Sequence, residues 1–347
     1  MKDRKLISRP RYGLRFALLG AVLLAAVLVS VVVGRYSISV SELLRLLFDS
    51  NGFYAENAAA AGSAAQVFYY IRLPRVLAAL MVGAALSMAG VSYQGMFRNP
   101  MVSPDILGAS TGAGFGASIA ILLGASYFVI SASAFVFGVG AVAVAWGVSR
   151  VSRRASPILA MILAGMIVSS LFSAGTSVIK LVADTQSQLP AITYWLMGSL
   201  SSIKVQDVRF MCIPILIGAI PLFVLRWRMN LLTAGEEEAR AMGVNTTALR
   251  LIVVIASTLL TAASVAVSGM IGWVGLVIPH FCRMLFGYDY RRLIPASAMF
   301  GAAYLLIVDD LCRLITTQEL PLGILTAIVG APLFLYLLIS GGGTARD

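Results

Sequence analysis

Ten long apolar runs constrain the fold of this chain more than any other feature of its sequence. Inside a bilayer the backbone polar groups must be satisfied within the protein, and about 20 mostly apolar residues in a helix cross the hydrocarbon core. We therefore predict an all-α polytopic membrane protein, one domain over residues 1–347 with about ten transmembrane helices. The predicted spans are 14–34, 76–96, 107–124, 127–149, 157–179, 209–225, 249–268, 271–286, 293–312 and 322–340.

The composition agrees with this fold class. Only 12% of the residues are charged, whereas a typical soluble domain has roughly 25%. A water-soluble enzyme of this length is therefore excluded.

The basic residues between the apolar runs set the expected orientation. The chain has 26 lysines and arginines, and cytoplasmic loops of membrane proteins are enriched in both. With the N-terminus inside and ten crossings, most of them fall on the cytoplasmic side, including the basic cluster in residues 2–15. Those left outside are Arg35, Arg45, Arg72, Arg75, Lys180, Lys204, Arg209 and Arg313. We predict that both termini are cytoplasmic, and that the net charge of +11 reports orientation rather than nucleic-acid binding.

Several kinds of chemistry find no support in the sequence. It contains no G-x-x-x-x-G-K-[ST] phosphate loop, so we do not expect this chain to hydrolyse ATP by that mechanism. Its single histidine, His280, and its three cysteines, Cys212, Cys282 and Cys312, do not have the spacing of metal ligands or of a disulfide framework. We expect no catalytic residues, no metal site and no cofactor bound by this chain.

Small residues predict tight helix packing in two spans. Gly108, Gly112 and Gly116 recur every four residues, and Gly83, Ala84, Ser87 and Gly90 form a similar stripe. Such stripes let neighbouring backbones approach closely. They indicate a compact bundle and no particular function.

Polar residues within the spans leave two interpretations open. Ser169, Ser173, Thr176 and Ser177 share one helical face, which either bonds its own backbone or lines a hydrated path that ends near Lys180. Asp309 and Arg313 are four residues apart, which favours an internal ion pair. The alternative is an ion-coupled secondary transporter that uses Asp309, Asp310 and Lys180, although it would usually need more carboxylates near mid-bilayer.

The segment 231–248 carries paired signals for the start and end of a helix. The acidic triplet Glu236, Glu237 and Glu238 suits the positive N-terminal end of a short helix beginning near Gly235. Gly243 can end that helix in the left-handed conformation, and Asn245 can cap a second helix that continues into the seventh span. We predict a rigid helix–turn–helix projection on the cytoplasmic side, able to receive force from a soluble partner.

Several motifs together resemble the FecCD-type permeases of ABC importers for iron-siderophore complexes, heme and cobalamin. The resemblance covers about residues 72–338. It rests on Arg72-Leu73-Pro74-Arg75, Arg98-Asn99-Pro100, Ile106-Leu107-Gly108, Tyr194-Trp195-Leu196-Met197-Gly198-Ser199-Leu200, Met242-Gly243-Val244, Gly275-Leu276-Val277-Ile278-Pro279-His280 and Glu319-Leu320-Pro321-Leu322-Gly323.

This resemblance implies a permease subunit rather than an enzyme, in the bacterial inner membrane. It implies a homodimer with the substrate path between the copies, two ATPase subunits that bind ATP and Mg²⁺ inside, a periplasmic or lipid-anchored binding protein outside, and contact with membrane lipid. The expected cargo is a ferric siderophore, with heme or cobalamin as alternatives.

The resemblance also implies roles for individual residues. ATPase coupling would use Glu236, Glu237, Glu238, Ala239, Met242, Gly243 and Val244. Binding-protein docking would use Arg72, Arg75 and Arg313, and the cytoplasmic gate Asn99, Pro100 and Met101. The face with Ser169, Ser173, Thr176 and Ser177 would line the translocation path.

Overall fold

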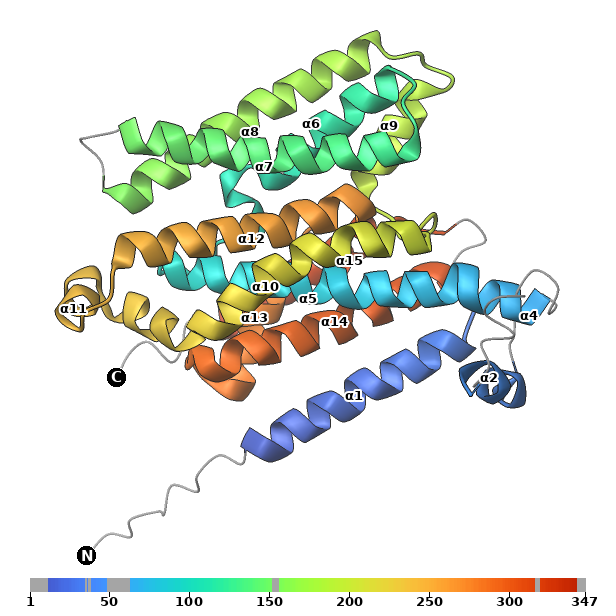
Figure 1. Ribbon diagram of the computed structural model, residues 1–347, viewed down its shortest axis with the longest axis horizontal. Coiled ribbons are helices and arrows are strands. Elements are labelled where there is room, and N and C mark those ends of the chain that lie inside the picture. Colours follow the sequence, from blue (N-terminus) through green and yellow to red (C-terminus); the bar gives the residue numbers. More distant parts are fainter. Residues whose placement is uncertain are drawn as a thin grey trace, which may run out of the picture.

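The computed structural model describes residues 12–34, 36, 39–48, 63–151, 156–315 and 319–341. Both chain ends, residues 2–11 of the basic cluster and Arg35 lie outside the described residues. The described residues form helices and no strands (Figure 1). In order these are α1 (Tyr12–Val32), α2 (Val40–Leu47), α4 (Ser63–Gln66), η1 (Val67–Arg72), α5 (Leu73–Met96), η2 (Pro104–Leu107), α6 (Ala109–Leu122), α7 (Tyr127–Val151), α8 (Pro157–Val182), α9 (Gln188–Met197), α10 (Val205–Ala234), α11 (Glu236–Ala241), α12 (Thr246–Ser268), α13 (Val274–Phe286), α14 (Tyr290–Ile315) and α15 (Leu322–Gly341).

Each predicted span overlaps one of these helices. Six helical stretches are long and apolar enough to cross a membrane, namely α1, α7, α8, α10, α12 and the continuous stretch Ala64–Met96 that includes α5. Helices α6 and α13 are apolar but have only 14 and 13 residues. The all-helical fold is confirmed, and the number of crossings beyond six remains a prediction.

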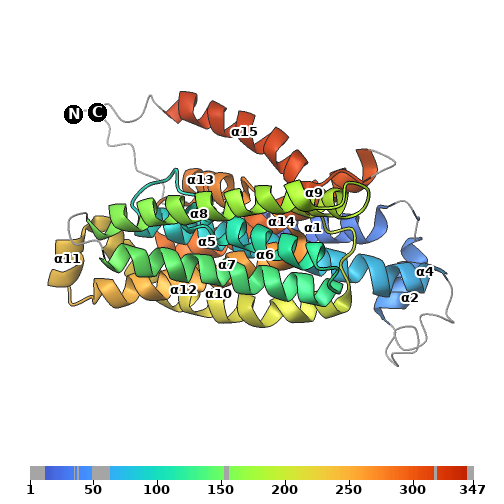
Figure 2. The same cartoon turned by 90° about the horizontal axis from the view of Figure 1, so that it is seen from above.

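Helix α5 lies at the centre of the bundle (Figure 1). It packs against α14, α12, α10 and α13, and most of its side chains are buried. Helices α6, α7 and α8 form a neighbouring layer, and α1 lies against α14. Helix α15 packs on few other helices and stands apart from the bundle when viewed from above (Figure 2). The bundle thus has a deeply buried central helix, whereas α15 has an open flank.

The helix directions define two ends of the bundle, which we call the α11 end and the α4 end (Figure 1). Helices α5 and α10 run toward the α11 end, whereas α1, α8, α12 and α14 begin there. The turn after α5 therefore lies on the same side of the bundle as α11, and the start of α5 lies at the opposite end with the end of α14. The predicted topology groups these segments in the same way, and the assignment of the α11 end to the cytoplasm stays a prediction.

The predicted stripes of small residues are sites of backbone contact. A Cβ atom on Gly83 would lie 2.2 Å from the carbonyl oxygen of Gly301 in α14, and one on Gly90 would lie 1.9 Å from that of Gly275 in α13. In α6, a Cβ atom on Gly112 would lie 2.6 Å from the carbonyl oxygen of Phe137 in α7. The missing side chains therefore allow helix backbones to touch, as the stripes predicted.

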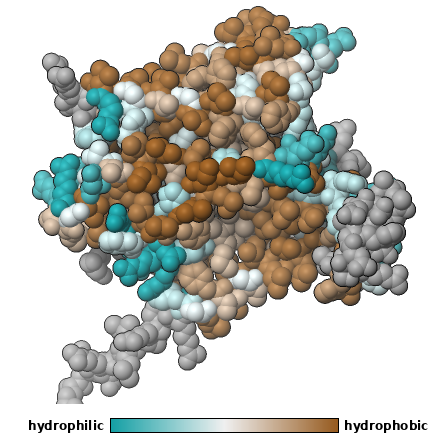
Figure 3. All heavy atoms as spheres, in the orientation of Figure 1, coloured by the Kyte–Doolittle hydropathy of each residue, from teal (hydrophilic) through white to brown (hydrophobic). Residues whose placement is uncertain are grey.

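The face of the bundle seen in Figure 3 is mostly apolar. Large apolar side chains are exposed on α1, α8 and α10, among them Leu24, Leu171 and Val224. Soluble monomers rarely expose contiguous apolar surface on this scale. The exposed apolar surface agrees with helices that face lipid.

Substitution of Gly90 by alanine tests the α5–α13 contact. The added methyl group would collide with a backbone oxygen, which no rotamer change can relieve, and we expect overpacking to cost about 1–3 kcal/mol. Gly140 in α7 is the matched control, since an added Cβ meets nothing within 4 Å there. We expect G90A to lower the thermal unfolding midpoint in detergent and G140A to leave it unchanged or raise it, because alanine favours helix. Equal midpoints would contradict the packing assigned to α5.

Candidate functional site

The segment 231–248 has the predicted helix–turn–helix structure. Helix α11 begins after Gly235, and Gly243 has a left-handed backbone with φ of +78°. Asn245 caps α12, because its side chain accepts a hydrogen bond from the backbone N–H of Ala248 at 3.0 Å. The start and stop signals read from the sequence are confirmed, and α11 projects from one end of the bundle (Figure 1).

Glu236 anchors α11 to the bundle. Its carboxylate accepts hydrogen bonds from Arg240 within α11 at 2.6 Å and from Arg250 in α12 at 2.7 Å. The hydrogen bond from Arg250 is the main reason that the pKa of Glu236 lies below its usual value. Ala239 is buried, whereas Glu237, Glu238 and Met242 are exposed. Among the predicted coupling residues, Glu236 and Ala239 therefore hold α11 to the bundle. The others named here form an exposed face that is both acidic and apolar.

The Asn99-Pro100-Met101 turn follows α5 at the same end of the bundle, and all three residues are exposed. The Asn99 side chain accepts a hydrogen bond from the backbone N–H of Met101 at 2.9 Å. Behind the turn, Gln94 donates to the carbonyl oxygen of Val102 at 3.1 Å and accepts a hydrogen bond from Arg283 in α13. The gate residues predicted from the sequence thus form an ordered turn tied to α13.

The hydroxyl face of α8 shows the first of its two interpretations, bonding to its own backbone. Thr176 donates to the carbonyl oxygen of Phe172 at 2.9 Å, and Ser177 donates to that of Ser173 at 3.0 Å, so these hydroxyls satisfy their own helix. Ser173 and Ser177 are exposed on the outer side of α8, whereas Ser169 packs close to Gly108. A path-lining role for this face remains a prediction.

The start of α5 and the end of α14 share a buried network of charges. The Arg75 guanidinium donates to both carboxylate oxygens of Asp309, each at 2.9 Å, and to Glu319 at 2.8 Å. Arg313 forms ion pairs with Asp309, at 3.5 Å, and with Asp310. The ion pair predicted between Asp309 and Arg313 is confirmed, and Arg75 joins it from α5.

A third arginine fastens α1 to this end of the bundle. Arg72 donates to the backbone carbonyl oxygens of Val31, Val32 and Tyr36, the second at 2.9 Å. These carbonyls lie at or beyond the end of α1, where no further helical N–H can reach them. Arg72 therefore satisfies the open end of a helix.

The sequence led us to expect exposed docking arginines, but these three arginines are buried. Arg72, Arg75 and Arg313 are only 3%, 5% and 7% exposed. They lie at the end of the bundle opposite α11, as predicted, but their guanidinium groups bond within the chain. The hydropathy pattern shows which end of a span a residue occupies, but it does not show which groups its side chain bonds to. Docking through these residues remains a prediction.

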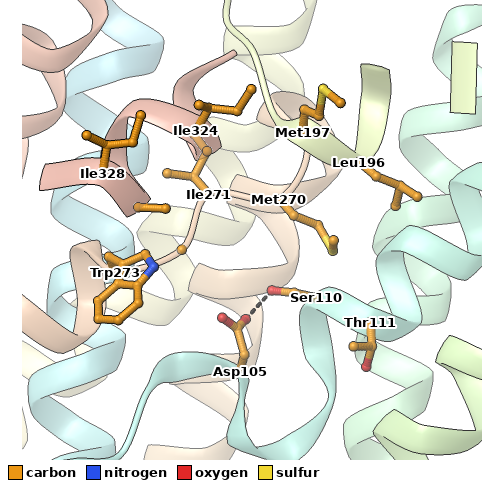
Figure 4. Close-up of a pocket in the computed structure, with 13 residues that line it drawn as sticks. Asp105, Ser110, Thr111, Leu196, Met197, Met270, Ile271, Trp273, Ile324 and Ile328 are labelled. Carbon is orange, nitrogen blue, oxygen red and sulfur yellow. Dashed lines mark hydrogen bonds between the residues drawn. The ribbon is translucent and has the colours of Figure 1, made fainter. Parts of the chain in front are cut away.

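A cavity of about 610 Å³ lies between η2, α9, the α12–α13 connection and the start of α15 (Figure 4). Its lining is mostly apolar and includes Met197, Met270 and Trp273. Among the described residues that line it, Asp105 alone is ionisable, and its carboxylate accepts a hydrogen bond from Ser110 (Figure 4). The sequence analysis did not identify Asp105, although a carboxylate between Pro104 and an apolar run was a signal that could have been used.

The α12–α13 connection reaches this cavity in a strained conformation. Trp273 has φ of +71°, a region that bulky residues rarely adopt. Its ring packs edge-on against Phe334 of α15 with the centroids 6.3 Å apart, and its Cβ lies 2.7 Å from the place where Gly330 would carry a Cβ atom. Such strain is often retained at functional sites, and here it holds an aromatic ring between the cavity and α15.

Comparison with known proteins identifies the family of this helix bundle. A sequence model described as the FecCD transport family matches residues 22–340. The chain belongs to the FecCD transport family. The resemblance inferred from the motifs is thereby confirmed across most of the sequence.

Relatives of this FecCD protein are permeases with several named cargoes. It is 42% identical to a molybdate import system permease of Haemophilus influenzae, over 92% of this chain and 95% of that one. It is 38% identical to an iron chelatin transport system permease of Helicobacter pylori, over 93% and 98%. Other relatives bear the names of hemin and cobalamin permeases.

A solved structure shares the fold of this FecCD protein. It is described as an inward-facing conformation of a metal-chelate type ABC transporter, with 39% identity, a TM-score of 0.84, and coverage of 95% of this chain and 100% of that one. The FecCD chain is therefore a permease subunit of an ABC importer and not an enzyme. ATP hydrolysis belongs to separate subunits.

Substitution of Arg75 by glutamine separates the structural role of this residue from docking. The change leaves the carboxylate of Asp309 buried without its bidentate partner, and breaking a buried pair costs about 3–5 kcal/mol. We expect a lower unfolding midpoint in detergent for R75Q, and partial recovery in R75Q/D309N. Arg209, exposed at the start of α10, provides the control R209Q. A wild-type midpoint for R75Q, with loss of binding-protein capture, would support docking instead.

Proposed function

We propose that this chain is one of two identical permease subunits of an ABC importer in the bacterial inner membrane, which carries a metal chelate into the cytoplasm. The observation that supports this proposal most directly is α11, a rigid projection with an exposed acidic face on a chain that has no phosphate loop. Such a permease must take its energy from a partner. In this proposal ATP and Mg²⁺ bind only to the two ATPase subunits.

The proposed topology has ten crossings with both termini in the cytoplasm. The ten apolar ranges, each overlapping a helix, and the excess of basic residues on one side support it. It places α11 and the gate residues Asn99, Pro100 and Met101 on the cytoplasmic side. It places the α4 end toward a periplasmic or lipid-anchored binding protein.

The homodimer would form on the side of α15. This helix is apolar, packs on few neighbours in its own chain, and borders the cavity that contains Asp105. A second copy would cover its open flank and enclose a path between the two subunits. Ser173 and Ser177 of α8 would line that path.

A ferric siderophore is the proposed cargo, and the cavity lining supports it. Methionine and tryptophan side chains favour contact with the organic surface of a chelate, and the carboxylate of Asp105 would repel a small anion. Molybdate is the second candidate, because the relative named for molybdate is 42% identical to this chain. Heme and cobalamin remain alternatives for the same cavity.

Reconstitution of the complete importer tests this function. Vesicles containing the permease, its ATPase and its binding protein are expected to accumulate a radiolabelled ferric siderophore only when ATP is supplied. Uptake of molybdate, heme and cobalamin, each measured alone, is compared with uptake of the siderophore. Undiminished uptake after ATP depletion, driven by a proton gradient, would overturn the proposal and favour a carrier using Asp309, Asp310 and Lys180.

Two substitutions at Gly243 test the coupling role of α11. An added Cβ there meets nothing within 4 Å, so the backbone angle of +78° is the only obstacle to a side chain. Asparagine tolerates this conformation and valine does not. We expect G243N to retain ATPase capture and ATP-driven uptake, and G243V to lose most of both while still inserting in the membrane. Glu237 is exposed, and we expect E237R to weaken capture without changing the unfolding midpoint.

Loss of capture by G243N and G243V alike would show that the glycine itself is required rather than the turn. Full capture by both variants would remove α11 from the proposed interface.

A further inference from the structure

Two adjacent hollows lie between α7 and α12, near the α11 end of the bundle, and Trp146 lines both of them. One is a polar cavity of about 220 Å³, formed by the ends of α7, α8, α11 and α12. The other is an apolar groove of about 230 Å³ between α7 and α12. Neither contains a residue of the cavity around Asp105. The two hollows thus place a charged cavity and an apolar groove on either side of one tryptophan.

The polar cavity has an excess of positive charge. Its described lining includes Arg150, Arg240 and Arg250 but a single acidic residue, Glu236. Glu236 already pairs with Arg240 and Arg250. Arg150 has no acidic partner among the described residues, and its guanidinium lies over the Trp146 ring at 5.0 Å. An anion in this cavity would therefore meet uncompensated charge.

Arg250 supplies a buried donor at the same place. The residue is 8% exposed, and its Nε atom has no hydrogen-bond partner within the described part of the chain. A buried N–H without a partner is costly, particularly on a charged group. The donor belongs to a residue that lines the cavity, which points to an acceptor from outside the chain.

The apolar groove continues from Trp146 along both helices. Its walls include Val139 and Val142 from α7, and Leu251 and Val254 from α12. The hydroxyl of Thr258, the one polar side chain in the lining apart from the Trp146 ring nitrogen, donates to the carbonyl oxygen of Val254 at 2.7 Å. The lining spans residues 139–146 and 251–259, a length of about 11 Å at 1.5 Å per residue. These dimensions suit part of a hydrocarbon chain.

We propose that this site binds an anionic phospholipid, with the phosphate in the polar cavity and an acyl chain in the groove between α7 and α12. A lipid is the occupant that matches a basic cavity next to an apolar groove on a membrane helix bundle, and basic pockets between transmembrane helices bind lipid headgroups. The two helices that line the groove, α7 and α12, lie with α10 on the side of the bundle opposite α15 (Figure 2). On the proposed topology, the α11 end, near which both hollows lie, is on the side of the cytoplasmic leaflet.

Lipid binding to the purified full-length protein tests the proposal by native mass spectrometry in detergent. Phosphatidylglycerol is expected to bind more tightly than phosphatidylcholine, whose headgroup carries no net charge. R150Q is expected to weaken phosphatidylglycerol binding about five-fold, since one basic residue near a membrane surface contributes about that factor. Arg228, also stacked on a tryptophan at 5.3 Å but outside both hollows, gives the control R228Q, which is expected to bind as the wild type does.

A second pair of variants tests the acyl part of the site. Ala143 lines the groove, and A143W would fill it; Val144, exposed on the adjacent surface of α7, provides the control V144W. Loss of phosphatidylglycerol in A143W but not in V144W, at equal unfolding midpoints, supports the proposal. Equal binding of the two lipids, equal effects of R150Q and R228Q, or displacement of the lipid by equimolar inorganic phosphate would overturn it. The last outcome would assign the cavity to a free anion. These measurements of lipid binding require no transport, so their outcome is independent of whether the proposed function is correct.

Discussion

Backbone contact along α5 is the constraint on which the rest of this structure depends. Gly83 and Gly90 have no room for a Cβ atom because the carbonyl oxygens of Gly301 and Gly275 occupy that space. In a bilayer the hydrophobic effect contributes little to the association of helices, so close van der Waals packing must do more. The glycines bring α13 and α14 against α5, and the position of α14 in turn places the charges of Asp309 and Arg313 beside Arg75.

The buried charge network follows from that packing. Asp309 is completely buried, and taking an ionised group out of water is costly unless it is paired with good geometry. Here the bidentate contact from Arg75 and the second contact from Arg313 provide the pairing. Glu319, which precedes α15, binds the same Arg75. The network thus connects the central helix to the start of the helix that packs least on its own chain.

At the α11 end, the bundle exposes residues that partners could contact, while α11 itself is held to the bundle. Glu236 fastens α11 through Arg250, and the remaining acidic and apolar residues of α11 face outward. The same arginine lines the polar cavity next to Trp146. On both proposals, contact with an ATPase and contact with a lipid headgroup would therefore meet at one short helix, because the side chains that hold it also line the polar cavity.

The sequence by itself determined the helical class, the approximate position of each long helix and the turn at Gly243. These depend on local properties, namely apolar length, glycine conformation and end capping, which act within a few residues. It also identified the Asp309–Arg313 pair, because four residues separate neighbours on one helical face. Only the tertiary structure decided that Arg72, Arg75 and Arg313 are buried, that Asp105 lines a cavity, and that Trp146 joins two hollows. Each of these depends on helices distant in the sequence, and hydropathy records how apolar a segment is without recording which segment packs beside it.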